Sequence, residues 1–494
     1  MNSDYMPDSA SSYRGDVGGK SHLCNTIYYN PAVSYIAPKN SDGSDFPQSD
    51  FFNAQRDGFP SNNPSGTVNL SNDFEPNSSS SREPAYYYRW KTGDAAALAE
   101  WATLSDSQKD SECNRSDDSS FPHTNGNWTK VRIDAAGQQN FANWYSYYRT
   151  RMMLMKTAAG LAFVGLNDNF RVGFITICPD GGSCDDDRDL TPVRPEYYLK
   201  IDNFTPTHKA AWFSKFYGQR PSGYTPLRQA LSRVGRHYAG MTDGINDGMP
   251  DDPIQYSCQQ NFALLTSDGY WNYGRGKQLD GRTDIGAQDQ NISVTPRPMY
   301  DGGTVVTTTI TENEQERYSR YRSSCGGYTR WERRTETVTV TVDQLGNTST
   351  QTSTSGTNTT NGCYTSPPLP PLPTNWTTYN STVTSGGASG SGGVANTLSD
   401  VAEYYYRTDL RPAGSLNALG VDVSKDNVPQ SGTGVEDDKA RHQHMTSFTL
   451  GLGVSGQLTF QDDYKTASSG HFAGLRAGSI GWPDPNPEIG RAHV

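Results

Sequence analysis

Three short and strongly apolar segments set the tightest constraint on the fold of this 494-residue chain. They are residues 170–177 (FRVGFITI), 261–266 (NFALLT) and 446–452 (TSFTLGL). Continuous apolar runs of this length are typical of strands that are buried within a sheet. Segments with helical spacing of apolar residues lie around them, at 141–166, 208–217, 226–238 and 398–407. Buried strands that alternate with helices predict a doubly wound α/β sheet, in which ligands bind beyond the carboxyl ends of the strands.

Long polar stretches interrupt this pattern. Threonine and valine alternate at 304–311 and 335–342, which predicts an antiparallel β-hairpin. Residues 346–362 are almost all Ser, Thr, Asn and Gly, and 385–393 has the composition of a flexible Gly/Ser linker. We therefore expect a core in two parts, at 141–273 and 398–487. We expect two insertions, at 1–140 and 274–397, and a short tail at 488–494.

Charge and hydropathy exclude several classes of function. The net charge of −11 disfavours binding to phosphate backbones, so nucleic acid is not an expected partner. There is no apolar run of about 18 residues, and we expect no membrane-spanning helix. The chain has seven cysteines and no CxxC pair, so a zinc ribbon is not expected, and a secreted, oxidising location is favoured over a cytosolic one. Either of two pairs could close a disulfide, Cys178 with Cys184 or Cys325 with Cys363.

Two strand-end features could hold a divalent cation. Thr225, in the segment GYTPL, directly precedes a predicted helix, and Asp268, in the segment LLTSDG, directly follows a predicted strand. Hydroxyl and carboxylate oxygens from separate loops are suitable ligands for Mg²⁺ or Ca²⁺. The alternative is purely structural, with Thr225 capping the helix and Asp268 forming a turn.

The order of these features resembles the von Willebrand factor A domain. That resemblance implies a metal site over the sheet, with Thr225 and Asp268 as ligands and a carboxylate from a partner completing the shell. The family's first strand ends in Asp-x-Ser-x-Ser, and no such motif follows an apolar strand within residues 1–140. We therefore expect the first strand and part of the metal site to be missing from this chain.

Longer motifs resemble the PilY/PilC family of type IV pilus biogenesis and tip-associated adhesins. They follow one another along the chain at 141–160 (FANWYSYYRTRMMLMKTAAG), 225–231 (TPLRQAL), 243–262 (DGINDGMPDDPIQYSCQQNF) and 264–272 (LLTSDGYWN). In that family the aspartate-serine motif is followed by an acidic Tyr-Met-Pro-Asp segment, and this chain opens with MNSDYMPD. We expect that the natural protein starts upstream of Met1 and that a C-terminal β-propeller is absent. Residues 488–494 are interpreted as a non-native tail.

The resemblance implies a role in pilus assembly and in tip-associated adhesion through the divalent cation. The implied partners are pilus minor subunits and host or surface receptors, and the implied location is extracellular, at the pilus tip or outer membrane. Two alternatives remain: a general secreted metal-dependent adhesin unrelated to pili, and a metal-free structural scaffold. No G-x-S-x-G, HExxH, Walker A or helix-opening GxGxxG motif is present, so we expect a binding protein and not an enzyme.

Three further motifs carry weaker hypotheses. The acidic segment 243–252 has a calcium-like spacing of oxygen ligands, and its alternative interpretation is an acidic, Gly-rich turn. A second acidic segment includes Asp180 and the aspartates of 185–189, and a turn is again the alternative. His442 and His444 form an HxH pair without an evident third ligand, so we expect no zinc there.

Overall fold

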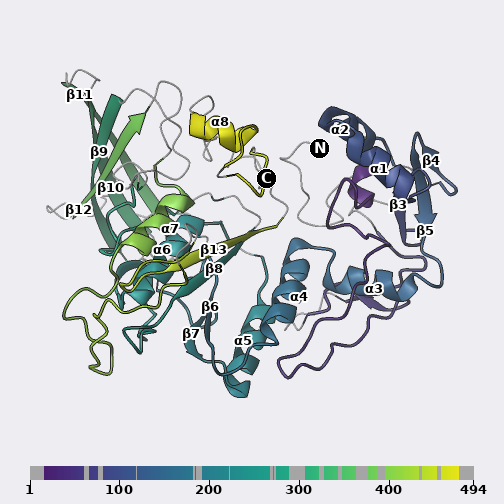
Figure 1. Ribbon diagram of the computed structural model, residues 1–494, viewed down its shortest axis with the longest axis horizontal. Coiled ribbons are helices and arrows are strands. Elements are labelled where there is room, and N and C mark those ends of the chain that lie inside the picture. Colours follow the sequence, from purple (N-terminus) through teal and green to yellow (C-terminus); the bar gives the residue numbers. More distant parts are fainter. Residues whose placement is uncertain are drawn as a thin grey trace.

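The computed structural model shows a mixed α/β protein (Figure 1). The four-stranded β9–β12 sheet lies at one side of the molecule, the β3–β5 region lies at the other, and the β6–β7 and β8–β13 pairs lie between them. The structure describes residues 16–59, 66–75, 82–117, 120–181, 184, 192–221, 223–267, 271, 274–286, 288, 306–321, 328–342, 348–362, 377–387, 395–432, 437–452, 458–464 and 466–477.

The N-terminal region has a packed core of its own. Its antiparallel sheet has the order β3-β5-β4, and a second, smaller sheet pairs β1 with β2. Two short helices and a 3₁₀ turn flank these strands. The elements are η1 (Gly18–Lys20), β1 (Ala54–Gln55), β2 (Thr67–Val68), β3 (Tyr86–Trp90), α1 (Ala95–Thr103), α2 (Asp106–Cys113), β4 (Thr124–Asn125) and β5 (Trp128–Arg132).

Aromatic side chains fill this N-terminal core. The rings of Trp90, Trp101 and Trp128 contact one another, with centroids 5.0–5.5 Å apart. Tyr28 is fully buried, and its hydroxyl donates to the backbone carbonyl of Tyr86, 2.7 Å away. A disulfide between Cys24 and Cys113 closes the region covalently. Tyrosine and tryptophan bury large areas while keeping a polar atom that must be paired, so a packed core can form in a stretch of low average hydropathy.

The helix predicted at 141–166 is wrong as a single element. The structure has two helices, α3 (Gln138–Tyr147) and α4 (Arg151–Phe163). The break has a local cause, because Thr150 adopts an extended backbone and its hydroxyl accepts a hydrogen bond from the Met153 amide at 3.2 Å. A threonine at this position satisfies an amide that the helix itself leaves unpaired. The helical spacing of apolar residues continues across the break and conceals it.

The strand predicted at 170–177 forms as β6 (Arg171–Ile175) and pairs antiparallel with β7 (Tyr198–Asn203). The register shifts at Gly173, where an added Cβ would lie 2.7 Å from the Ile201 side chain. Every residue of β6 is partly exposed, so the expectation of full burial is wrong for the described residues. Helix α5 (Pro206–Gly218) packs on both strands, as its apolar spacing predicts.

The strands predicted at 261–266 and 446–452 form a parallel pair, β8 (Phe262–Ser267) and β13 (Thr446–Gly451). Their expected burial is wrong for the described residues, because Phe262, Leu264, Phe448 and Leu450 are all exposed. Helices α6 (Leu227–Tyr238) and α7 (Leu398–Arg407) pack against each other, α6 contacts β8 and α7 contacts β13. Each helix was predicted to within a residue of its observed bounds. In the described part of the chain, β6–β7 and β8–β13 remain separate two-stranded sheets. The class is therefore mixed α/β.

The predicted hairpin is confirmed and is longer than expected. Strands β9 (Val306–Tyr321) and β10 (Tyr328–Val342) pair antiparallel within a four-stranded sheet of order β11-β10-β9-β12. Residues 346–362 were expected to be a polar linker, but most of them form β11 (Thr348–Gly362). Threonine is a strong β-former because of its branched Cβ, and this outweighs the polar composition. Strand β12 (Thr377–Gly387) similarly extends into the expected Gly/Ser linker.

Two further features complete the described structure. A short helix, α8 (His471–Ala477), follows the β8–β13 region along the chain. Among the helices of the described residues, none combines the length and the apolar character that crossing a membrane would require.

Candidate functional site

Thr225 lies at the entry to α6. Its backbone carbonyl accepts a hydrogen bond from the Leu227 amide at 2.9 Å, and the carbonyl of Pro226 accepts from Ala230 as the first helical bond. The side chain of Thr225 is half-buried. The predicted position of this residue, directly before a helix that packs on a central strand, is therefore correct.

Asp268 lies outside the described residues, but the chain on both sides of it is placed. Strand β8 ends at Ser267, whose carbonyl accepts a hydrogen bond from Leu452 at 2.8 Å, just after the end of β13. Trp271 is buried, and the guanidinium of Arg228 in α6 lies 5.5 Å from its ring centroid. Asp268 comes three residues before Trp271 in the sequence.

Gly274 fixes the return of the chain to α6. Its φ is +76°, and a Cβ at this position would lie 2.5 Å from the Cβ of Pro226 and 3.1 Å from that of Gln229. Gly274 therefore lies against the first turn of α6, beside Pro226, the residue that follows Thr225.

Three buried arginines on α6 hold neighbouring segments of the chain against this helix. Arg228 donates to the carbonyl of Asn396 at 3.0 Å, and Arg233 donates to that of Ile245 at 2.6 Å. Arg236 is fully buried and donates to Asn246 at 3.1 Å and to the carboxylate of Asp243 at 2.6 Å. Guanidinium groups carry several donors in a rigid plane, which suits them to hold separate loops on one helix. Sequence reasoning missed this role, because a spacing of arginines does not reveal which carbonyls face them.

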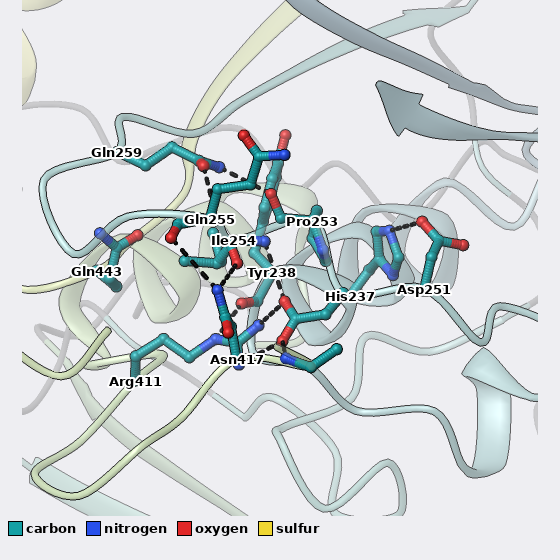
Figure 2. A network of polar contacts seen from close by, with 12 residues as sticks. His237, Tyr238, Asp251, Pro253, Ile254, Gln255, Gln259, Arg411, Asn417 and Gln443 are labelled. Carbon is teal, nitrogen blue, oxygen red and sulfur yellow. Dashed lines mark hydrogen bonds and ion pairs between the residues drawn. The ribbon is translucent and has the colours of Figure 1, made fainter. Parts of the chain in front are cut away.

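The acidic segment 243–252 is a structural turn. Asp252 accepts two hydrogen bonds from Arg411, which is labelled in Figure 2, and further bonds from the amides of Ile254 and Ala418. The Nε of Arg411 also donates to the carbonyl of Tyr238 at 2.8 Å. Arg411 thus joins the acidic segment, which precedes β8 along the chain, to the end of α6. The carboxylate of Asp252 is fully hydrogen-bonded by donors of the protein itself.

A second carboxylate of this segment, Asp251, pairs with Tyr198 and His237. Tyr198 donates to it at 2.6 Å, and the Nε2 of His237 lies 3.5 Å from its other oxygen. Burial by itself would raise the pKa of Asp251, but the hydrogen bonds from His237 and Tyr198 outweigh that effect and lower the pKa. The aspartates of this segment point to different partners, so the calcium hypothesis is not supported and the turn interpretation holds.

One cluster in the described residues has the residue types and spacing of a metal site. It consists of Cys178, Asp180 and Cys184, all buried, with potential ligand atoms within 4.8 Å of one another. The two sulfurs are joined in a disulfide, which confirms the pairing that the sequence allowed. A disulfide sulfur is a poor ligand compared with a thiolate, so the cluster is a covalent loop closure. Cys325 and Cys363 lie outside the described residues, and Cys258 is an exposed free thiol.

The HxH pair serves an internal network. His444 is buried, and its Nε2 lies 2.8 Å from a carboxylate oxygen of Asp438, while its Nδ1 lies 2.8 Å from the carbonyl of His442. His442 in turn contacts the carbonyl of Tyr406 at 3.1 Å. Both rings therefore contact protein oxygens.

Comparison with known proteins confirms the resemblance inferred from the motifs: the chain is related to the type IV pilus biogenesis factors. The relatives are three proteins of Pseudomonas aeruginosa, each named type IV pilus biogenesis factor PilY1, from strains PAK, ATCC 15692 (PAO1) and UCBPP-PA14. Each relative is 26% identical to this chain. The aligned stretches are 510, 493 and 520 residues long and cover 97%, 97% and 99% of this chain. The chain spans about a third of the length of these relatives, 33% in each case. No protein-family profile matches the chain, and no solved structure gives a significant match.

Proposed function

We propose that this chain is part of a type IV pilus biogenesis factor. The observation that carries this proposal is the similarity to PilY1 along nearly the whole chain, at 97% coverage or more. The proposed partners are pilus minor subunits and surface receptors, and the proposed location is extracellular, at the pilus tip or outer membrane. The proposed mode of action is binding and not catalysis.

The binding site that we propose is a divalent-cation site of the von Willebrand A type. Support comes from the parallel β8–β13 pair, which is covered by α6 and α7, and from Gly274, which follows β8 in the sequence and lies against Pro226, the residue after Thr225. Ligands in α/β sheets bind beyond the carboxyl ends of parallel strands. The proposed site therefore lies beyond the carboxyl ends of β8 and β13. Thr225 would contribute a hydroxyl and Asp268 a carboxylate to Mg²⁺ or Ca²⁺, and a partner's carboxylate would complete the shell.

The proposed arrangement of the sheet also has a structural basis. Arg171, the first residue of β6, donates to the carbonyl of Pro253 at 2.6 Å and to Gln259, in the segment that leads into β8. The β6–β7 and β8–β13 pairs are thereby held near each other, and β6 and β8 each keep one edge unpaired among the described strands. One further strand between these edges would convert the two pairs into a single doubly wound sheet.

Calorimetric titration of Mg²⁺ and Mn²⁺ into the purified chain tests the cation site. Because part of the metal site is expected to be missing from this chain, we expect weak binding heat for the wild type, and at least a tenfold lower affinity still for Asp268→Asn and for Thr225→Val, because each removes an oxygen ligand. Asp426→Asn is a matched control, because Asp426 is an exposed aspartate in the described residues whose loss should leave the titration unchanged. Heat that is equal in the wild type and in Asp268→Asn would reject the site and favour the metal-free scaffold.

The pilus role is tested separately in the source cell. Deletion of the gene should reduce surface pili recovered by shearing, and the wild-type gene should restore them. If restoration fails for Asp268→Asn but succeeds for Asp426→Asn, the cation site serves the pilus function. Normal piliation in the deletion strain would contradict the pilus role and favour a general adhesin.

A further inference from the structure

The four-stranded sheet has an edge that lacks the usual protection against pairing. Strand β11 lies at one end of the order β11-β10-β9-β12 and pairs along its whole length with β10 (Figure 1). Among the described strands, β10 is its one partner. In an antiparallel strand, about half of the backbone N–H and C=O groups point away from a single partner. The outer edge of β11 therefore presents a row of hydrogen-bonding groups over 15 residues.

Natural proteins protect such edges with charged residues, prolines or short strands. Strand β11 has none of these devices, because Thr348–Gly362 contains no Asp, Glu, Lys, Arg or Pro and is long. The side chains of residues 350–356 are all exposed. They are small or uncharged, so they leave the edge accessible to another strand.

The sequence of β11 is self-complementary. Residues 349–355 read STQTSTS, which is nearly symmetric about Thr352. If two copies pair antiparallel with Thr352 facing Thr352, then Thr350 faces Thr354 and Ser349 faces Ser355. Cross-strand Thr–Thr and Thr–Ser pairs are favourable in antiparallel sheets. This single register aligns every threonine of the segment with another threonine.

Charge supports a second copy at this edge. Two chains of net charge −11 repel each other on average, so a contact between copies needs a locally neutral surface. Strand β11 is uncharged, and the stretch of β10 that pairs with residues 349–355 carries a single charged residue, Glu336. That charge lies a further strand spacing, about 4.8 Å, from the edge.

We propose that the chain dimerises through β11, by antiparallel pairing of two copies about Thr352, to form a continuous eight-stranded sheet. The interaction uses neither Thr225 nor Asp268 and is independent of the proposed cation site. Backbone hydrogen bonds would supply most of the affinity, and the alignment of threonines would set the register.

Disulfide cross-linking of single-cysteine variants maps this register. In a Cys258→Ser/Cys325→Ser/Cys363→Ser background, Thr352→Cys should form a covalent dimer under mild oxidation, because its Cβ faces its own copy at about 5 Å. Thr354→Cys alone should cross-link at least fivefold less, because its copy lies four residues away along the strand. A mixture of Thr350→Cys and Thr354→Cys chains should form the mixed dimer. Self-cross-linking of Thr354→Cys equal to that of Thr352→Cys would overturn the proposal.

Introducing a charge at Thr352, the residue that would face its own copy in the dimer, provides a second test. By sedimentation equilibrium, Thr352→Lys and Thr352→Glu should each weaken dimerisation about fivefold through like-charge repulsion, and an equimolar mixture should regain the wild-type affinity. The matched control is Asp426→Lys, a charge change at an exposed loop position, which should leave the equilibrium unchanged. A wild-type chain that remains monomeric at 100 μM, or a mixture that fails to recover, would overturn the proposal and leave this edge to a strand of another protein.

Discussion

At the residue scale, the buried cation Lys156 shows how a polar group can organise this core. Its Nζ is inside the protein and donates to the carbonyls of Tyr217 at 2.6 Å and Gln219 at 2.7 Å. It therefore fixes the end of α5 against α4. Burial, with repulsion from Arg220 as the next contribution, lowers the pKa of Lys156 to about 8.

This lowered pKa predicts a rise in stability with pH. Between pH 8 and about 10.5 the unfolded chain binds a proton at Lys156 that the folded chain has released, so unfolding becomes less favourable as the pH rises. We expect the free energy of unfolding, measured in urea, to increase by about 1–2 kcal/mol from pH 8 to pH 9.5. The increase should be absent in Lys156→Met. An equal increase in that variant would assign the effect to other groups.

The candidate ligands illustrate what sequence can predict at this scale. The position of Thr225 follows from local chemistry, since proline is favoured at the start of a helix and Pro226 directly precedes α6. The pairing of Asp252 with Arg411 could not be foreseen, because these residues are distant in sequence and only the fold brings them together. Spacing of carboxylates alone suggested a calcium loop, and buried guanidinium groups in fact neutralise two of them.

At the element scale, the contact between α6 and α7 depends on a missing side chain. Gly235 lies within α6, and a Cβ there would come within 2.2 Å of the ring of Tyr405. Tyr405 is fully buried in α7, and its hydroxyl donates to the carbonyl of Lys277 at 2.6 Å. The two helices approach closely because Gly235 leaves room for this ring.

We therefore predict that Gly235→Ala destabilises the chain although alanine is the better helix former. Overpacking of a filled contact costs about 1–3 kcal/mol, which exceeds the gain of up to about 1 kcal/mol in helix propensity. Gly165→Ala is the control, because a Cβ at Gly165 meets no atom within 4 Å. Chemical denaturation should show a loss for the first variant and little change for the second. A stabilised Gly235→Ala would contradict the close packing.

Periodicity predicted the individual elements of this region well. Helices α6 and α7 and strands β8 and β13 were expected almost at their observed bounds, because each carries a complete apolar pattern. The break before α4 was missed, since Thr150 interrupts the backbone without interrupting the pattern. Strand β11 was missed because its threonines were counted as polar, whereas their branched side chains favour an extended backbone.

At the scale of the whole molecule, the Cys24–Cys113 disulfide closes the largest covalent loop among the described residues, with a sequence separation of 89. Cross-links stabilise mainly by restricting the unfolded chain, so long loops contribute most. The Cys24→Ser/Cys113→Ser variant should lose about 4 kcal/mol, and Cys178→Ser/Cys184→Ser about 2 kcal/mol. Thermal unfolding of both variants measures the difference. A larger loss for the short loop would indicate that strain or local packing dominates.

Sequence analysis gave no sign of the N-terminal core that this disulfide closes. Its residues are tyrosines, tryptophans and phenylalanines separated by polar turns, so the local hydropathy stays low and no period emerges. The pairing of cysteines 89 residues apart also leaves no local signature. Only three-dimensional packing reveals that the stretch is a folded unit, with α3 contributing Phe141 and Trp144 to its centre.

The same disulfide determines how the chain would respond to a pulling force. An extended chain reaches about 3.3–3.6 Å per residue, so the 89-residue separation corresponds to a contour length of about 300 Å. With the bond intact, tension applied at the two ends passes through the sulfurs and cannot extend this length. Rupture of the aromatic core would then extend only the part of the chain outside the loop, such as the stretch that carries Trp128 and Phe141, whereas reduction of the one bond would also release the whole 89-residue separation.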